Sequence, residues 1–351
     1  MQRRPRVYIA NTGGTIGMRP GLSGYEPSPG YLAEQLAELA ALRAEHMPDF
    51  EVGEQAPLLD SAYMRPADWL RIARDIEANY DRFDGFVVVH GTDTMAYTAS
   101  ALPFLLQNLS KPVILTGSQI PLCEARSDAR NNLITAIGLA AEHPIPEVCI
   151  YFDGRLLRGC RASKVDASSF EAFDSPNYPP LGRVGVTVEV YWDRILAPPP
   201  LGSRLTLQSV ATPMVGTLRL FPGITAEWVR NSLRPPLQGL VLETYGVGNG
   251  PTDDAAFLAA LREATARGVV IVAVSQCGHG RVRLGDYASG SGLVRAGVIS
   301  GVDMTTEAAL AKLYHLLSLE MGIDDVRRLM QRSLRGELSG ELSADPPSAS
   351  D

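Results

Sequence analysis

Two threonine-rich turns carry the residues whose types and spacing best suit chemistry. Residues 12–17 read Thr-Gly-Gly-Thr-Ile-Gly, and residues 90–95 read His-Gly-Thr-Asp-Thr-Met. Each segment directly follows a short apolar run, which predicts a turn at the carboxyl end of a strand. Glycines let the backbone turn sharply and bring amide groups near a ligand, and threonine hydroxyls can attack or bind a carbonyl. The two turns therefore indicate a site for a small carbonyl compound.

Other interpretations of these turns have to be weighed. Either turn alone is also typical of a threonine that caps the next helix. A phosphate or dinucleotide site is the competing function, but neither segment has the GxGxxG spacing or the P-loop GxxxxGK[ST] pattern. Two such turns in one domain favour a functional site over a pair of helix caps. No cysteine or histidine spacing indicates a metal site, and we expect neither a metal nor an organic cofactor.

Both turns resemble the two signature segments of bacterial-type L-asparaginases. The resemblance continues through Gly24-Tyr25, Asp60-Ser61, residues 116–119 (Thr-Gly-Ser-Gln), residues 161–164 (Arg-Ala-Ser-Lys), residues 175–178 (Ser-Pro-Asn-Tyr) and residues 245–249 (Tyr-Gly-Val-Gly-Asn). It covers the chain to about residue 335 and is greatest for the cytoplasmic type I subgroup. It implies hydrolysis of L-asparagine to aspartate and ammonia through a threonine acyl-enzyme.

Amide hydrolysis requires a nucleophile, a route for protons and stabilisation of the oxyanion. Thr15 lies on the glycine-rich turn, and the phenol of Tyr25 could pass on its proton. In the family, the position of Thr15 is the usual acyl-accepting residue. The residues themselves leave open which threonine attacks.

Thr92, Asp93 and Lys164 form a second catalytic group. The ammonium of Lys164, held by Asp93, could tune the Thr92 hydroxyl or a water that Thr92 orients. Most lysines are exposed surface residues, and only the resemblance around Lys164 marks this one as catalytic. Asp93 could instead stabilise a helix N-terminus, and its carboxylate could also bind the α-ammonium of the substrate.

The resemblance implies that residues 60–62 bind the α-carboxylate of the substrate through the Ser61 hydroxyl and main-chain amides. The substrate-binding residues on this hypothesis are Asp60, Ser61, Ala62, Thr92 and Asp93. Ala62 departs from the family, in which many relatives have a polar side chain. That departure affects one contact and leaves the main-chain contacts intact.

Two histidines lie near these motifs. His90 ends an apolar strand and is more typical of a hydrogen-bonded structural histidine than of the base of a triad. His279 lies in a glycine-rich loop, residues 277–280, and could approach the site of a neighbouring subunit.

Some type I relatives bind a second asparagine at a subunit interface and are activated by it. The resemblance places Ser163 and Cys277 at two of the effector contacts, and it places Glu243 where an arginine is expected. Because the cation for the effector's carboxylate would be missing, we expect asparagine activation to be weak or absent.

The elements that position these residues follow a βα rhythm. Short apolar runs predict strands at Val7–Ala10, Phe86–Val89, Val113–Leu115 and Val148–Phe152, with helices between them that have apolar residues three and four positions apart. This alternation predicts an α/β fold in which a mainly parallel sheet is flanked by helices. Ligands of such sheets bind at the carboxyl ends of the strands.

The domain prediction places the N-terminal asparaginase domain at residues 1–190, a linker rich in proline at 191–213, and a smaller α/β C-terminal domain at 214–340. Strands are expected there at Leu240–Glu243 and Val269–Val274. Residues 341–351 are rich in serine, proline and acidic residues and are expected to be disordered.

Composition restricts the partners and the compartment. The chain has 351 residues and a formal net charge of −7, which disfavours nucleic acid as a partner. The apolar run after Arg3, Arg4 and Arg6 is too short for a signal peptide, and no stretch reaches the roughly 20 apolar residues that span a membrane. Four cysteines without a CxxC pattern fit reduced thiols. We therefore expect a cytoplasmic enzyme whose partner is the small molecule L-asparagine, and the family implies a homodimer or a dimer of dimers.

Two other functions share these sequence features. The first is the amidase subunit of a tRNA-dependent amidotransferase, although such subunits normally carry an extra N-terminal domain and the first strand here begins at residue 7. The second is a non-catalytic amino-acid sensor. The intact set of polar residues argues against a sensor: Thr15, Tyr25, Thr92, Asp93 and Lys164.

Overall fold

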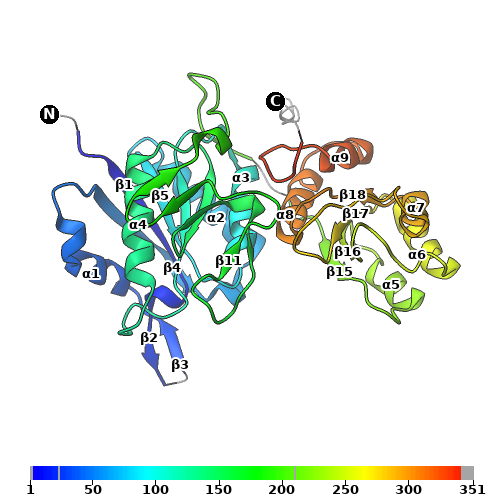
Figure 1. The fold of residues 1–351 in the computed structure, drawn as a ribbon, viewed down its shortest axis with the longest axis horizontal. Helices are drawn as coiled ribbons and strands as arrows, with labels where there is room; N and C mark the ends of the chain where they lie inside the picture. Colours follow the sequence, from blue (N-terminus) through cyan, green and yellow to red (C-terminus); the bar gives the residue numbers. More distant parts are fainter. Residues whose placement is uncertain (1–2, 23, 209–210, 341–351) are drawn as a thin grey trace. The chain divides into compact units, whose positions relative to one another are not determined.

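A computed structural model describes residues 3–22, 24–208 and 211–340 of the chain. The chain forms two compact units, and the first of them ends at Gln208 (Figure 1). Each unit has its own sheet and its own apolar core. The expected disordered tail, residues 341–351, lies outside the described residues, as do residues 209–210 of the predicted linker.

The first unit is built on an eight-stranded sheet with the order β13-β12-β9-β8-β7-β5-β1-β4. The strands from β4 to β8 in this order are parallel, and β9, β12 and β13 are joined by antiparallel pairing. Their bounds are β1 (Arg6–Gly13), β4 (Asp49–Leu59), β5 (Gly85–Val89), β7 (Val113–Thr116), β8 (Val148–Phe152), β9 (Arg155–Arg158), β12 (Gly182–Val184) and β13 (Val188–Val190). The four predicted strands of this sheet are present.

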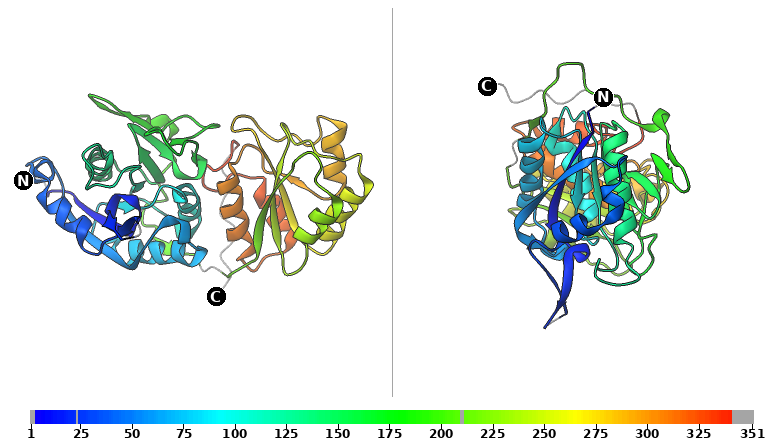
Figure 2. Two further views of the ribbon diagram at one scale, coloured as in Figure 1. Left: turned by 90° about the horizontal axis from the view of Figure 1, so that it is seen from below. Right: turned by 90° about the vertical axis from the view of Figure 1, so that its left-hand side faces the viewer.

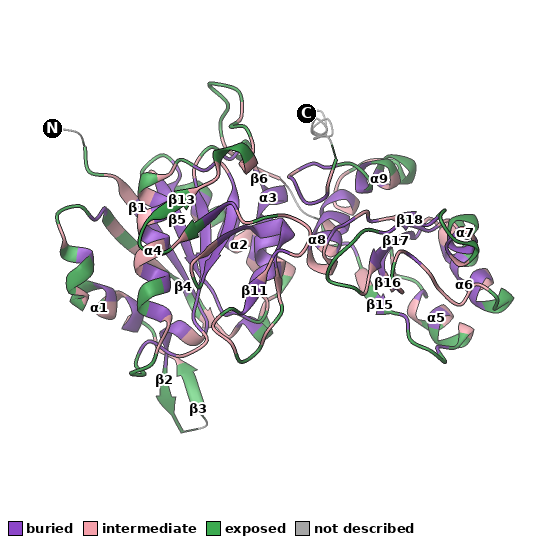
Figure 3. Cartoon of the chain, in the orientation of Figure 1, coloured by how far each residue is buried: buried purple, intermediate pink, exposed green. Residues whose placement is uncertain are grey.

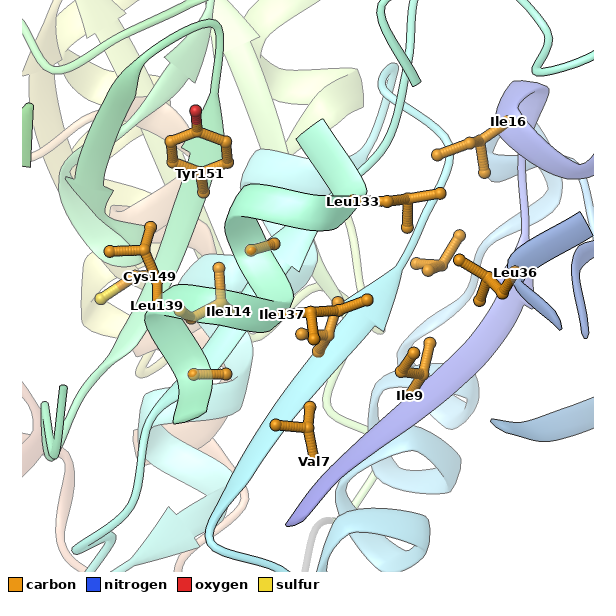
Figure 4. Close-up of a cluster of buried hydrophobic side chains, with 14 of the residues drawn as sticks. Val7, Ile9, Ile16, Leu36, Ile114, Leu133, Ile137, Leu139, Cys149 and Tyr151 are labelled. Carbon is orange, nitrogen blue, oxygen red and sulfur yellow. The ribbon is translucent and has the colours of Figure 1, made fainter. Parts of the chain in front are cut away.

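Helices cover both faces of this sheet: α1 (Tyr31–Glu38), α2 (Pro66–Asn79), α3 (Met95–Leu105) and α4 (Ala129–Glu142). Side chains of β1 alternate between the faces, so that Val7 and Ile9 pack with Leu133 and Ile137 of α4 (Figure 4). On the opposite face the Tyr8 hydroxyl donates to Asp75 of α2 at 2.8 Å. Both faces of the central strands are therefore buried, which explains their continuous apolar sequence.

Shorter elements surround this sheet. The hairpin of β2 (Met18–Gly21) and β3 (Gly24–Pro27) projects from the first unit (Figure 2) and is mostly exposed, whereas β5 is buried throughout (Figure 3). The other short strands are β6 (Leu106–Gln107), β10 (Ser163–Lys164), β11 (Phe173–Asp174) and β14 (Thr206–Leu207). The 3-10 turns are η1 (Thr15–Gly17), η2 (Ala40–Arg43), η3 (Ser61–Tyr63), η4 (Gly159–Arg161) and η5 (Trp192–Arg194).

The second unit has a four-stranded parallel sheet with the order β15-β16-β17-β18. The strands are β15 (Val215–Arg219), β16 (Gly239–Thr244), β17 (Val270–Ser275) and β18 (Ile299–Ser300). The helices are α5 (Ala226–Ser232), α6 (Ala255–Ala266), α7 (Ala288–Arg295), α8 (Thr306–Leu317) and α9 (Ile323–Met330). The predicted α/β fold of a larger and a smaller parallel-sheet domain is thus confirmed.

Inside the second unit, the fully buried Lys312 of α8 forms an ion pair with Glu337 at 2.6 Å.

Across the described ranges, none of the helices is both long and apolar enough to span a bilayer.

Candidate active site

The carboxyl ends of three adjacent parallel strands, β1, β5 and β7, meet at one edge of the larger sheet. The register pairs Asn11 with Val89 and Val89 with Thr116. Two hydrogen bonds of 2.9 Å join the strands beyond this register. The Thr12 hydroxyl donates to the Val89 carbonyl, and the His90 amide donates to the Thr116 carbonyl. The segments that follow these strands therefore share the edge where ligands of parallel sheets bind.

Glycines allow the turns to touch through their backbones. Gly14 has a φ of 84°, and a Cβ added to it would lie 2.3 Å from the Gly91 nitrogen. A Cβ on Gly91 would lie 2.5 Å from the Ser61 hydroxyl oxygen. A side chain at either position would collide with the neighbouring segment. Hence the two threonine turns and the segment of residues 60–62 pack directly against one another.

The predicted group of Thr92, Asp93 and Lys164 is assembled. The Lys164 ammonium on β10 donates to the Thr92 hydroxyl at 2.8 Å and pairs with the Asp93 carboxylate at 2.7 Å. Thr92 is 5 % exposed, whereas the Asp93 side chain is 66 % exposed. The Lys164 ammonium can therefore stabilise negative charge at Thr92 while Asp93 stays accessible to a substrate cation.

One residue of this site was not given a role from the sequence. The Thr92 hydroxyl donates to the side-chain oxygen of Gln119 at 3.2 Å, and the Gln119 side-chain nitrogen donates to the Ser169 carbonyl at 3.0 Å. The backbone amide of Gln119 donates to the Asp128 carboxylate. The available signal was its place just after the strand at 113–115, on the same edge as both threonine turns.

Thr15 and Tyr25 are not paired in the structure. Thr15 begins η1 and is half-buried. Tyr25 lies on β3, is 47 % exposed, and donates its hydroxyl to Glu124 at 2.7 Å rather than to Thr15. This hydrogen bond raises the pKa of Tyr25 above its usual value. The structure therefore pairs Tyr25 with Glu124 and not with Thr15.

Residues 60–62 are the N-cap and the first two residues of the turn η3. The Asp60 carboxylate accepts a hydrogen bond from the backbone amide of Ala62 at 2.9 Å. This amide is therefore already bonded inside the turn. Ser61 is 3 % exposed, and the Thr94 hydroxyl donates to its carbonyl at 2.9 Å. Within the described part of the chain, the Ser61 hydroxyl has no hydrogen-bond partner, so it is available to an anion.

His90 lies just behind the second threonine turn and is completely buried. Its Nδ1 lies 2.7 Å from the Gly91 carbonyl oxygen and its Nε2 lies 2.8 Å from the Thr98 hydroxyl. A carbonyl can only accept, so Nδ1 carries the proton and Nε2 accepts from Thr98. Burial lowers the pKa of His90 to about 4. Both nitrogens of this neutral ring are thus engaged, and neither of them bonds to the hydroxyl of Thr15 or of Thr92.

We expect His90 to make stability depend on pH. Its pKa is lower in the folded chain than the ordinary value of 6.5. The resulting stabilisation is full above pH 6.5 and is lost as the pH falls through about 4, because protons then bind the unfolded chain first. Urea unfolding between pH 7 and pH 4 should show a shallower pH slope for His90→Asn than for the wild type. The exposed His279, changed to asparagine, should leave the slope unaltered, and an unaltered slope in His90→Asn would contradict the expectation.

Of the three candidate effector residues, one belongs to the first unit and two belong to the second. Ser163 lies on β10 of the first unit, while Glu243 on β16 and the exposed Cys277 belong to the second. Glu243 pairs with Arg219 of the neighbouring strand β15 at 3.0 Å. The carboxylate at 243 is thus neutralised locally, and the guanidinium of Arg219 is already engaged.

Within the described ranges, no group of three or more histidine, cysteine, aspartate or glutamate side chains is arranged to hold a metal ion.

Comparisons with known proteins cover nearly the whole chain. Residues 6–196 match the family model "Asparaginase, N-terminal", and residues 214–330 match the model "Glutaminase/Asparaginase C-terminal domain". L-asparaginase 1 of Escherichia coli (strain K12) is 50% identical over 97% of this chain and 99% of its own length. L-asparaginase of Thermococcus kodakarensis is 36% identical over 95% of this chain and 99% of its own. The crystal structure of L-asparaginase I from Vibrio cholerae matches with a TM-score of 0.88 and 46% identity, covering 96% of this chain and 100% of that one.

Proposed function

The chain belongs to the asparaginase family, and from this membership we propose that it hydrolyses L-asparagine to aspartate and ammonia through a threonine acyl-enzyme. The close packing of Gly14 against Gly91 supports this function most strongly. It holds two threonine turns side by side at one sheet edge, so that a single carboxamide can contact both. Such a pair can supply both the nucleophile and the stabilisation of charge that amide hydrolysis requires.

Thr15 is the better nucleophile of the two threonines. The Thr92 hydroxyl donates to Gln119 and accepts from Lys164, so both its proton and a lone pair are engaged. Thr15 has no such partners among the described residues. Its oxygen would bond to the carboxamide carbon, the C–N bond would break, and ammonia would leave with the threonine proton. A water held near Thr92 would then cleave the ester and return the proton to Thr15.

The proposed contacts to the substrate follow the charges of the site. Asp93 is exposed enough to receive the α-ammonium, and the Ser61 hydroxyl, which lies against Gly91 of the second threonine turn, is the donor for the α-carboxylate. Asp60 shapes this turn by holding the Ala62 amide. Tyr25 would pass the proton of Thr15 once its phenol has left Glu124.

Ammonia release from L-asparagine and from L-glutamine tests the function directly. We expect turnover of asparagine by the isolated protein, with glutamine slower by about 10- to 200-fold because a methylene changes pocket energies by about 1–3 kcal/mol. Binding without turnover would indicate an amino-acid sensor. Turnover that requires an added tRNA-charging partner would indicate an amidotransferase component. Either result would overturn the proposal.

We also expect the rate to depend hyperbolically on asparagine concentration. Glu243 stands where the resemblance places an arginine, and the guanidinium of Arg219 is already paired with the Glu243 carboxylate, so neither side chain offers a free cation to the carboxylate of an effector amino acid. Initial rates measured over a wide range of asparagine concentrations should therefore fit a Hill coefficient near 1. A sigmoidal curve would contradict this expectation. Glu243→Arg is the matched variant, and a sigmoidal curve gained by it would identify Glu243 as the cause.

The proposal includes a cytoplasmic homodimer or dimer of dimers, with a C-terminal domain at residues 214–340 and an N-terminal domain that reaches beyond the expected residue 190 to the end of the first unit at Gln208. Light scattering of the purified protein measures the assembly. A monomer that is fully active would overturn this part.

A further inference from the structure

The hairpin of β2 and β3 is attached to the rest of the first unit through few side-chain contacts. Most of its side chains are exposed. Among the described residues, its attachments include the bond from Tyr25 to Glu124, a long contact of 3.7 Å from the Cys123 thiol to the Met18 carbonyl, and Arg19 stacked over Tyr31. The buried Met18 side chain anchors the base of the hairpin. Of the contacts made by its exposed part, the bond from Tyr25 to a carboxylate is the short, charge-assisted one.

Glu124, in contrast, belongs to a loop that is firmly held. Residues 117–128 connect β7 to α4, and the Asp128 carboxylate accepts from the backbone amides of Gln119 and Ile120 at 3.0–3.1 Å. The hydroxyls of Ser118 and Ser127 both donate to the Ile120 carbonyl. The Ser127 amide closes a turn onto the Glu124 carbonyl at 3.1 Å. Glu124 is thus a carboxylate presented from a fixed loop.

The same loop contacts both halves of the proposed site. Gln119 accepts the hydrogen bond of Thr92, and the Leu122 amide donates to the carbonyl of Ile16, the residue after Thr15. Glu124 follows two residues later and binds Tyr25. The carboxylate that binds the phenol is therefore tied to both threonine turns through one short segment.

We propose that Glu124 is a positioning residue that retains Tyr25 away from Thr15 in the substrate-free enzyme, and that this bond breaks as asparagine binds, before the phenol serves the reaction. The inference rests on the proposed function, because that function assigns Tyr25 to the proton of Thr15. It adds a residue outside the two catalytic groups that controls when Tyr25 becomes available.

A population argument gives the expected effect. If substrate binding requires Tyr25 to be released, the apparent dissociation constant is the intrinsic one divided by the released fraction. An exposed hydrogen bond to a carboxylate restrains the hairpin modestly, so removing it should tighten asparagine binding by about two- to fivefold. Steps after binding do not involve Glu124, so kcat should stay within about twofold of the wild type. The effect should thus appear in KM and not in kcat.

Glu124→Gln and Glu124→Ala test the inference by two measurements. Calorimetry in the Thr15→Ala background gives the affinity for asparagine without turnover. Hydrogen exchange of the hairpin amides in the absence of substrate reports the attachment itself, and it is independent of any activity. We expect tighter binding and faster exchange in both variants, with the larger change in Glu124→Ala.

Two controls isolate the contact. Glu26→Gln removes a carboxylate from the next position of the same strand, where Glu26 lies opposite Arg19 of β2, and it should change neither measurement. Adding Tyr25→Phe should abolish the effect of Glu124→Gln on affinity. Unchanged or weaker asparagine binding, unchanged exchange, or an equal effect of Glu26→Gln would overturn the inference. Failure of the proposed function would instead appear as a wild-type enzyme that releases no ammonia.

Discussion

Thr15→Ala is expected to lower kcat for asparagine hydrolysis by at least about 1000-fold, because the variant lacks the proposed nucleophile. The neighbouring turn would still orient a water through Thr92 and Lys164, whose 2.8 Å contact does not involve Thr15. A small residual rate should therefore persist. KM should change little, since the substrate's charged ends are proposed to bind elsewhere. Steady-state ammonia release measures both constants.

Two matched variants separate the hydroxyl of Thr15 from the shape of its turn. Thr15→Ser keeps a hydroxyl and should retain far more activity than Thr15→Ala. Thr12→Val removes a hydroxyl from the same turn, but that hydroxyl donates to the buried carbonyl of Val89 and is structural. This variant should lose about 1 kcal/mol of stability and keep kcat within a few-fold. Comparable losses of kcat in Thr12→Val and Thr15→Ala would contradict a nucleophilic Thr15.

The buried part of the fold was predictable because its sequence is continuously apolar. Residues such as Val87 and Ile114 are completely buried in central strands, and a parallel sheet covered on both faces requires this composition. Edge strand β4 escaped prediction because its sequence, Asp49–Leu59, mixes charges with apolar residues and is buried at only one position. The β2–β3 hairpin escaped for a related reason, because exposed four-residue strands leave no apolar period to detect.

The candidate site was predictable as a set of residues but not as a set of contacts. Strand ends place Thr15 and Thr92 at a common edge, and this follows from the order of apolar runs. Lys164 is positioned in another way, because it lies on the two-residue strand β10, which pairs with β11 so that Lys164 is opposite Phe173. The contact of Lys164 with Thr92 depends on this pairing between distant segments, which leaves no local pattern in the sequence. Glu124 and Gln119 were overlooked for the same reason, because a loop residue shows its partner only in three dimensions.

Lys164→Met should lower kcat by about 10²- to 10⁴-fold, the range over which proton transfer and charge stabilisation by a single side chain contribute. Methionine fills similar space but removes the donor from Thr92 and leaves the Asp93 carboxylate without its cation. Asparagine binding should be retained, since Asp93 stays available to the α-ammonium. The loss should therefore fall on kcat and not on KM. If the defect lies in the second half of the reaction, mass spectrometry of the variant should detect an aspartyl group on Thr15.

Lys164→Arg and Lys111→Met make the result specific. A guanidinium keeps the charge but is planar and larger, so it should not restore the two short contacts to Thr92 and Asp93. Lys111 donates to the carbonyls of Tyr80 and Phe83, so its replacement removes an equally bonded ammonium from the same unit. That variant should be less stable yet keep its kcat. Equal losses of kcat at positions 111 and 164 would show that the ammonium of Lys164 only stabilises the fold. A loss of kcat confined to position 164 would show that this ammonium acts in the reaction through the hydroxyl of Thr92.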